Sequence, residues 1–167
     1  MALVVEDGTG KSTAEAYDSI ANAAAYLLEV GSSTFNALAT DALKEEAARR
    51  ATRYMEARWR TRWKGNKTLE TQALAWPRYN VTDEDGFTVD SDSVPLAVRE
   101  AFAEACEIAS TSGEDLEPDV TPPVKVARID VLEVEFFPGS NPLAVRSKVL
   151  GKIAYLLDDS NTLARSA

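Results

Sequence analysis

"DALKEEAARRATRYMEARW", residues 41–59, is the stretch that decides the fold class. Its apolar residues recur at steps of four, the spacing that puts side chains on one face of an α-helix. Thr40 precedes the stretch and can cap the first turn, because its hydroxyl can accept a hydrogen bond from a free backbone N–H. The stretch therefore predicts a long helix with one buried face. The residues expected on that face are Leu43, Ala47, Ala51, Met55 and Trp59, and Trp63 would extend it if the helix continued.

A shorter helix is expected before this one, over residues 19–30. Ser19 can cap its first turn, and Gly31 can adopt the left-handed conformation that ends many helices. The residues expected to face inward are Ile20, Ala24, Leu27 and Leu28.

Two more helices are expected after the long one. The first covers residues 94–111, with Ser93 as its cap, Pro95 in its first turn and Gly113 as its stop. Its inward residues are expected to be Val98, Ala101, Phe102, Ala105, Ile108 and Ala109. The second starts at residues 141–142, an Asn-Pro pair. The residues expected on its apolar side are Val149, Leu150, Ile153 and Leu157.

The helical periodicity disappears between residues 65 and 92, where Trp-Pro and Asp-Gly pairs interrupt the chain. Such breakers predict a long ordered loop with a tight turn at Asp85 and Gly86. We expect Trp76 to anchor the loop with a large buried surface, because Pro77 holds the residues before it in an extended conformation. The full set of predicted anchor residues is Trp76, Pro77, Arg78, Asp83 and Gly86.

An acidic, proline-rich stretch at residues 114–123 predicts a linker. The next segment, 124–137, reads as β structure whose alternation changes phase twice, so a bulge or two short strands is expected. We therefore predict a mainly α fold, a small helical bundle with a long loop and a short β-hairpin or strand segment. The bundle would occupy residues 1–113, with the loop inserted at 65–92, and residues 124–167 would form the β segment and a C-terminal arm. That arm could become ordered only on binding.

The composition excludes several kinds of chemistry. The 167 residues include no histidine, so a histidine-based catalytic triad, a histidine general base and a histidine-containing zinc site are excluded. Nothing marks out carboxylate, lysine or tyrosine chemistry, and we expect no enzyme activity, cofactor or metal. The single cysteine, Cys106, is expected in the core. No apolar run could span a bilayer and no signal peptide is evident, so a cytoplasmic protein without membrane contact is expected.

The stretch "VVEDGTGKST", residues 4–13, ends in the Gly-Lys-Ser of a nucleotide-binding phosphate loop. Such a loop needs a glycine five residues before Gly10, because the backbone must curl there around the phosphates. Val5 occupies that position, and Gly8 lies three residues too late. We therefore expect a flexible turn after a short strand, with Lys11 in solvent, and no nucleotide hydrolysis.

The formal net charge of −9 disfavours a general nucleic-acid binder, but the basic residues are distributed unevenly. Eight of the eighteen lie between residues 49 and 67, where Glu56 is the single acidic residue. We call these eight the basic belt. They are Arg49, Arg50, Arg53, Arg58, Arg60, Arg62, Lys64 and Lys67.

Three interpretations of the basic belt stay open. Glutamates lie four residues before Arg49, Arg50 and Arg60, which predicts helix ion pairs and a solvated, partly paired face. The belt could instead contact an acidic protein surface, including that of a second copy in a head-to-tail ring. Single-stranded nucleic acid is the third partner, although the aromatic residues of the belt are expected to face inward rather than stack on bases.

Three stretches of the chain, in their order and spacing, carry a resemblance. They are "VVEDGTG…AEAYDSIANAAAYL" in residues 4–27, "TLETQALAWPRYNVTDEDGFTVDSDSVPLAVREAFAEAC" in residues 68–106, and "VEFFPG" in residues 134–139. Together they resemble a family of head–tail connector proteins of tailed phages, whose members are often labelled DnaT-like single-stranded-DNA-binding proteins. The similarity covers about residues 3–140, and the part from Gln72 to Gly86 is the most specific.

The resemblance implies a structural virion protein that forms a ring, usually of a dozen copies, beneath the portal and joins head to tail. The implied partners are further copies, the portal protein, a downstream tail or head-closure protein, and genomic DNA that passes through the channel without sequence-specific binding. The protein would lie at the head–tail interface of the virion, and in the host cytoplasm before assembly. The alternative is a DnaT-like single-stranded-DNA-binding replication accessory. The basic belt is the candidate partner interface.

Overall fold

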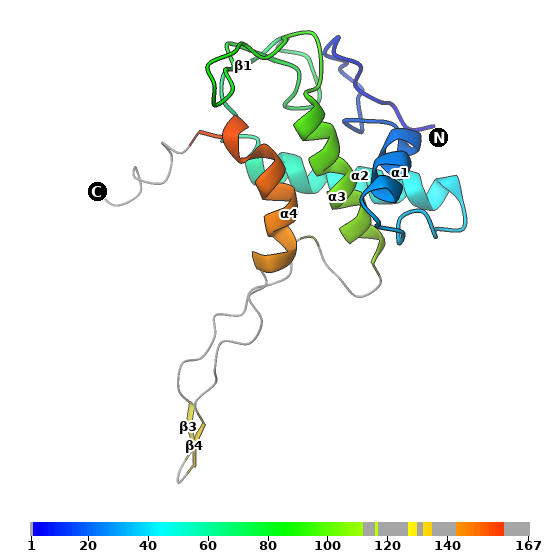
Figure 1. Cartoon of the computed structure of the whole chain (residues 1–167), viewed down its shortest axis with the longest axis vertical. Helices are drawn as coiled ribbons and strands as arrows, with labels where there is room; N and C mark the ends of the chain where they lie inside the picture. Colours follow the sequence, from blue (N-terminus) through cyan, green and yellow to red (C-terminus); the bar gives the residue numbers. More distant parts are fainter. Residues whose placement is uncertain (1, 112–115, 117–126, 130–131, 135–142, 159–167) are drawn as a thin grey trace.

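The computed structural model describes residues 2–111, 116, 127–129, 132–134 and 143–158. These residues form four α-helices and two small antiparallel two-stranded sheets (Figure 1). The prediction of a mainly α fold with a short β-hairpin is confirmed.

The long helix, α2, spans Asp41–Trp59, as predicted. The Thr40 hydroxyl accepts a hydrogen bond from the Leu43 N–H at 3.3 Å and caps the first turn. Ala47, Ala51, Met55 and Trp59 are buried, but Leu43 is exposed, so its assignment to the core was wrong. The reason is that burial along α2 begins only at Ala47, one turn after Leu43.

Helix α1 spans Ile20–Glu29 and has the predicted cap, since the Ser19 hydroxyl accepts from the Asn22 N–H at 3.1 Å. Gly31, with φ of +79°, follows its end. The predicted inward face was partly wrong, because Leu28 is 63% exposed. Ala23 and Leu27 are the buried residues of this helix, and Leu28 points about 100° away from Leu27 around the helix axis.

Helix α3 spans Leu96–Ser110, and all its predicted inward residues are buried. The predicted cap at Ser93 was wrong. Pro95 has extended backbone angles and is itself the N-cap, so Ser93 lies two residues too early to bond a free amide of the first turn. The helix ends before Gly113, the predicted stop, which lies outside the described residues.

Helix α4, Leu143–Ile153, packs along α3 and continues into the short 3₁₀ helix η1, Ala154–Leu156. Val149 and Ile153 are buried as predicted, whereas Leu150 is exposed. Leu157 is buried beyond the helix rather than on it. Residues 147–158 of the predicted arm are thus packed into the bundle. The predicted linker lies outside the described residues apart from Leu116, and the domain division stays a prediction.

One of the two sheets was predicted from the sequence and the other was not. Strand β1, Asn66–Lys67, pairs with β2, Arg78–Tyr79, inside the long loop, and neither strand was predicted. Strand β3, Ala127–Ile129, pairs with β4, Leu132–Val134, with Arg128 opposite Glu133. This second hairpin lies within the predicted β segment, and two short strands are one of the two forms expected for it.

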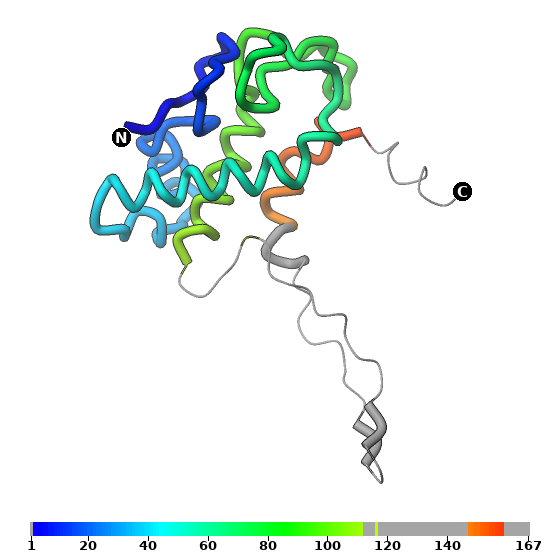
Figure 2. The backbone as a smooth tube through the Cα atoms, turned by 180° about the vertical axis from the view of Figure 1, so that it is seen from behind, coloured from blue at the N-terminus to red at the C-terminus, as the bar shows by residue number. Residues whose placement is uncertain are grey.

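The helices are arranged around α3. Figure 1 shows α3 crossing in front of α2, with α1 and α4 on opposite sides of it, and Figure 2 shows α2 from the other side. The loop of residues 65–92 and the N-terminal segment lie side by side at one end of the bundle in both views. Ala73 donates its N–H to the Lys11 carbonyl at 3.0 Å and joins the two.

Candidate functional site

The N-terminal turn that resembles a phosphate loop already holds an anion, the side chain of Glu6. Its carboxylate accepts hydrogen bonds from the N–H groups of Gly8 at 3.0 Å, Gly10 at 2.8 Å and Lys11 at 2.8 Å. Glu6 is only 3% exposed. The amides that would surround a phosphate therefore surround an internal carboxylate, which supports the expectation that no nucleotide binds here.

Two details of this turn differ from the prediction. It is not merely a flexible turn, because Glu6 fixes three of its amides and a bridge joins Val5 to Ala16. Lys11 is also not simply in solvent: its Nζ lies 2.8 Å from an Asp7 carboxylate oxygen and 3.0 Å from the Val5 carbonyl. The Lys11 ammonium lowers the pKa of the Asp7 carboxyl well below its usual range.

Two of the three predicted ion pairs in the basic belt are present. Arg49 lies 3.3 Å from Glu45 and also 3.2 Å from Glu15, and Arg60 lies 3.3 Å from Glu56. The Glu46–Arg50 pair was wrong. Arg50 instead donates to the Ala109 carbonyl on α3, because its side chain reaches across to the neighbouring helix.

Two further belt residues are bonded to backbone carbonyls. Lys64 Nζ donates to the Tyr155 carbonyl and Lys67 Nζ to the Gln72 carbonyl, both at 2.7 Å. Partial burial lowers the pKa of Lys67. These lysines hold the chain together at the two ends of β1, so most of the belt has a structural role.

Three belt arginines, Arg53, Arg58 and Arg62, make no side-chain hydrogen bond or ion pair within the described part of the chain. We call them the free arginines. The aromatic residues interleaved with them, Trp59 and Trp63, are buried. The belt thus offers a few cationic groups but no exposed ring on which a base could stack.

The predicted loop anchor is buried at its centre. Trp76 and Pro77 are inaccessible to solvent, and the peptide bond between them is cis. The Arg78 guanidinium donates to four carbonyls, those of Trp63, Lys64, Gly65 and Ala75, at 2.6–3.3 Å. Burial lowers the pKa of Arg78. This arginine, on β2, joins the segment between α2 and β1 to the loop just before β2.

The other two anchor residues form a separate turn, residues 82–88, which we call the hairpin turn. Asp83 Oδ1 accepts from the N–H groups of Asp85 at 3.0 Å and Phe87 at 2.8 Å, and a bridge joins Thr82 to Thr88. Gly86 has φ of +87°, in the region that favours glycine. The turn presents the side chain of Phe87, which is 70% exposed.

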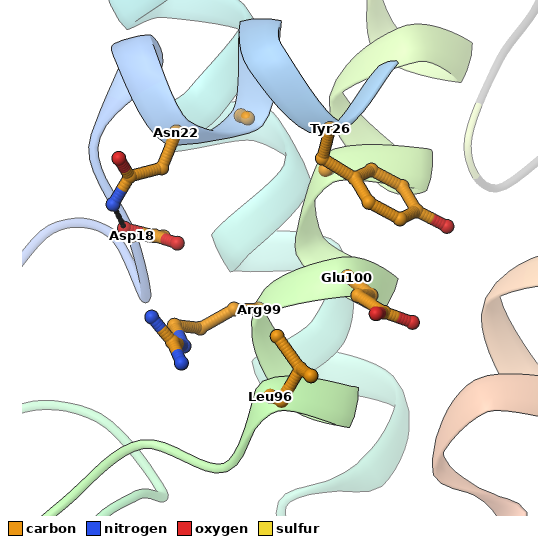
Figure 3. A pocket seen from close by; sticks show the side chains of 8 residues that line it. Asp18, Asn22, Tyr26, Leu96, Arg99 and Glu100 are labelled. Carbon is orange, nitrogen blue, oxygen red and sulfur yellow. Dashed lines mark hydrogen bonds between the residues drawn. The ribbon is translucent and has the colours of Figure 1, made fainter. Parts of the chain in front are cut away.

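A cavity of about 230 Å³ lies between the beginnings of α1 and α3 (Figure 3). Its two carboxylates have partners: Asp18 accepts from the Asn22 amide at 2.7 Å, and Glu100 lies 2.6 Å from Lys152. Arg99 points to the opposite side from Glu100, toward Asp18 and Asn22 (Figure 3). Its Nε is buried and has no hydrogen-bond partner among the described residues.

Other kinds of site receive no support from the described residues. They contain no group of acidic or cysteine side chains arranged to hold a metal ion. No helix among them combines the length and the apolar character needed to cross a membrane. Cys106 is buried on α3, and burial raises the pKa of its thiol well above the usual value, as suits a core residue.

Comparison with known families gives one match. The model of a family described as "Putative DnaT-like ssDNA binding protein" matches residues 1–165. The chain belongs to this family. The DnaT-like part of the predicted resemblance is thereby confirmed, whereas the connector role is not part of the family's description and stays a prediction. No curated protein and no solved structure matches the chain of this DnaT-like family member.

Sequence reasoning missed Glu6, Phe87 and Arg99. A glutamate two residues before a Gly-x-Gly turn could have indicated Glu6, because its carboxylate can reach the amides of the turn that follows. Phe87 stands in an alternating stretch that reads as half-buried, and Arg99 lies on the helix side opposite the predicted core. Their roles depend on tertiary packing that local patterns do not contain.

Proposed function

We propose that this member of the DnaT-like family is a non-enzymatic assembly protein, a head–tail adaptor whose copies form a ring on the portal of a tailed phage. The observation that carries the proposal is the division of exposed charge between two elements. The free arginines lie along α2 and just past its end, whereas the loop between Arg78 and Arg99 has no basic residue. Its exposed carboxylates are Glu84, Asp85, Asp90 and Asp92.

Charge divided in this way favours contact between unlike surfaces. A basic element and an acidic element on one subunit can each meet its opposite on a neighbour, and such head-to-tail contacts close into rings. The resemblance to connector proteins supports the same arrangement. In this proposal the partners are further copies, the portal and a downstream tail or head-closure protein, and DNA passes through the channel without being held.

Light scattering coupled to size-exclusion chromatography tests the adaptor proposal directly. The full chain is measured alone and mixed with the portal protein of the same phage, and the complex is imaged by electron microscopy. We expect a ring of chains on the portal. Monomers in both conditions, with no density added to the portal, would overturn the proposal.

Single-stranded DNA binding is the second candidate, and the description of the family favours it. The free arginines could contact about three phosphates, which predicts a salt slope of about −2 for single strands. The structure supplies little else for this role, because single-strand binders combine basic grooves with exposed aromatic platforms. Trp59 and Trp63 are buried.

Fluorescence anisotropy with a labelled oligothymidine separates the two candidates. The triple variant Arg53→Glu, Arg58→Glu and Arg62→Glu is compared with Lys148→Glu, an exposed lysine on α4. Under the adaptor proposal, wild type shows no micromolar binding at low salt. Binding that weakens with salt, is lost in the triple variant and survives in Lys148→Glu would establish the second candidate instead.

A further inference from the structure

We propose that copies of this chain join head to tail by inserting Phe87, on the hairpin turn of one copy, into the cavity between α1 and α3 of the next. This inference rests on the proposed function and specifies its copy-to-copy contact. It joins two features that the fold leaves unexplained, an exposed aromatic side chain and a cavity whose guanidinium has no partner among the described residues.

Phe87 has the properties of an interface anchor. At 70% exposed it is the most exposed large apolar side chain among the described residues. Its backbone is fixed, because Asp83 accepts its N–H at 2.8 Å and its carbonyl accepts the Asp83 N–H at 2.9 Å. An aromatic side chain on a fixed backbone has only two side-chain torsions to lose on binding, and aromatic residues are enriched among those that dominate interface energies.

The cavity is large enough for a phenyl ring, and its lining is mixed. Its volume is about 230 Å³, and it opens to the surface. Apolar side chains line one part of it, and the polar side chains of Asp18, Asn22, Arg99 and Glu100 line the rest. Ala23 and Ala103 are buried in its wall, and Leu96 stands 62% exposed beside it. Inserting Phe87 would cover two exposed apolar side chains, those of Phe87 and Leu96.

The charges next to the ring and in the cavity are complementary. Glu84 and Asp85 precede Phe87 on the turn, are exposed, and make no side-chain hydrogen bond or ion pair within the described chain. In the cavity, Asp18 and Glu100 already have partners, so Arg99 is the charged group left to pair. A carboxylate of the turn can reach this guanidinium as the ring enters the cavity.

A second copy is the occupant that fits these features. The hairpin turn and the cavity are made of different residues of one subunit, so the contact is heterologous, and a dimer keeps one free turn and one free cavity. Such a contact grows into a ring when its rotation closes. It also leaves the free arginines on α2 available for a different acidic partner, such as the portal.

Cross-linking of single-cysteine variants tests the contact. Phe87→Cys and Leu96→Cys are mixed and treated with a short bis-maleimide, in the full-length chain with and without portal; Cys106 is buried and does not compete. We expect a cross-linked dimer from the mixture but not from either variant alone. Tyr79→Cys, another exposed aromatic position, replaces Phe87→Cys as the matched control and should give no product.

Loss-of-contact variants provide the second readout. Phe87→Ala and Leu96→Glu each alter an exposed side chain, so both should fold, and each should weaken association about 30-fold or more. A mixture of the two should form dimers and nothing larger, because one turn and one cavity remain intact between them. Arg99→Glu should also weaken association, and Glu84→Arg with Asp85→Arg should partly restore it.

The outcomes distinguish this contact from the proposed function. Rings that form normally with Phe87→Ala and Leu96→Glu, without the 87–96 cross-link, would overturn the contact and leave the adaptor proposal standing. Cross-linking of residue 87 to the portal would also overturn it. Failure of wild type to assemble with or without portal would overturn the adaptor proposal itself, and the contact with it.

Discussion

Two turns of this molecule are both held by a carboxylate that accepts backbone N–H groups, but the results differ. In the N-terminal turn, Glu6 accepts three backbone N–H groups and is buried with them, whereas in the hairpin turn Asp83 accepts two and remains partly exposed. The first turn matches a phosphate-loop motif in part, yet its amides are already occupied. The second has no motif, yet it presents an unpartnered aromatic ring. The carboxylate of the N-terminal turn thus occupies the amides of a potential anion site, whereas that of the hairpin turn holds an aromatic side chain at the surface.

Substitution of one glycine in each turn should give the largest difference in the free energy of unfolding. Gly8 and Gly86 both have positive φ, +97° and +87°. A Cβ on Gly8 would lie 1.8 Å from the Asp92 carbonyl oxygen, whereas a Cβ on Gly86 would meet nothing within 4 Å. Gly8→Ala should lower the free energy of unfolding by about 3–5 kcal/mol, from overpacking and backbone strain together. Gly86→Ala should lower it by about 1–2 kcal/mol, from strain alone.

Urea unfolding followed by tryptophan fluorescence measures both glycine variants, since all three tryptophans are buried. Equal losses of unfolding free energy in the two variants would contradict the predicted difference. They would mean that the N-terminal turn does not pack against Asp92 as it does in the structure. If Gly8→Ala does not fold, Gly8→Ser offers no milder substitution. The folded fraction of Gly8→Ala is then compared with that of Gly86→Ala.

Replacing the carboxylates of the two turns, Glu6 and Asp83, should give the next largest difference in the free energy of unfolding. Glu6 uses both oxygens, Oε1 for Gly8 and Gly10 and Oε2 for Lys11. In Glu6→Gln an amide NH₂ would face one of these donors, at a cost of about 2–4 kcal/mol of unfolding free energy. Asp83 accepts both bonds with Oδ1 alone, so the carbonyl of Asp83→Asn can replace it and the loss should stay below about 1 kcal/mol.

Amide hydrogen exchange checks this prediction residue by residue. The N–H groups of Gly8, Gly10 and Lys11 should exchange faster in Glu6→Gln, whereas those of Asp85 and Phe87 should change little in Asp83→Asn. Unchanged protection at Gly10 in Glu6→Gln would show that the buried carboxylate does not organise the N-terminal turn.

A third carboxylate, Glu56 on α2, is bonded to a buried tyrosine whose raised pKa makes stability depend on pH. Its Oε1 accepts the Tyr17 hydroxyl and the Ala75 N–H. Burial, and then the nearby Glu56 charge, raise the pKa of Tyr17 well above 10. The folded-state value therefore exceeds the unfolded one, so this contribution is complete below about pH 10 and is lost as the pH rises toward the folded-state pKa.

Tyr17→Phe is the variant that tests this pH dependence. It should lower the unfolding free energy by about 1–2 kcal/mol at pH 7, because Glu56 loses a donor, and should reduce the further loss above pH 10. Tyr79→Phe, at an exposed tyrosine, is the matched control and should leave both quantities unchanged. An alkaline profile identical to wild type in Tyr17→Phe would contradict the assignment.

Much of the fold was predictable because the helices are long, capped and periodic. Residues 41–59 and Thr40 contain the whole local description of α2, and its bounds were predicted correctly. Which side of a helix is buried depends on its neighbours, and this is where Leu28 and Leu43 were misplaced. The two-residue strands β1 and β2 could not be predicted, because two residues are too few to show an alternating pattern and their pairing joins segments eleven or more residues apart.

The candidate site was less predictable than the fold. The basic belt is evident in the sequence, but its division into bonded residues and free arginines requires the positions of the Ala109, Tyr155 and Gln72 carbonyls. Phe87 is exposed because Asp83 turns the chain there. Arg99 has no partner among the described residues because the nearby carboxylates bond to Asn22 and Lys152. Each of these facts is a relation between distant residues.

The smallest expected effect concerns Lys11, the residue that makes the N-terminal turn look like a nucleotide site. Its ion pair with Asp7 is exposed, and exposed pairs contribute about 0–1 kcal/mol, so Lys11→Met should change stability by less than about 1 kcal/mol. The pKa of Asp7 should rise toward its ordinary value, which carboxyl NMR titration can follow. Calorimetry with ATP and GTP should show no binding to either protein. A phosphate would have to displace Glu6 from three amides and then lie beside the released carboxylate. Binding by wild type that is lost in Lys11→Met would therefore show that the N-terminal turn can release Glu6 and hold a nucleotide.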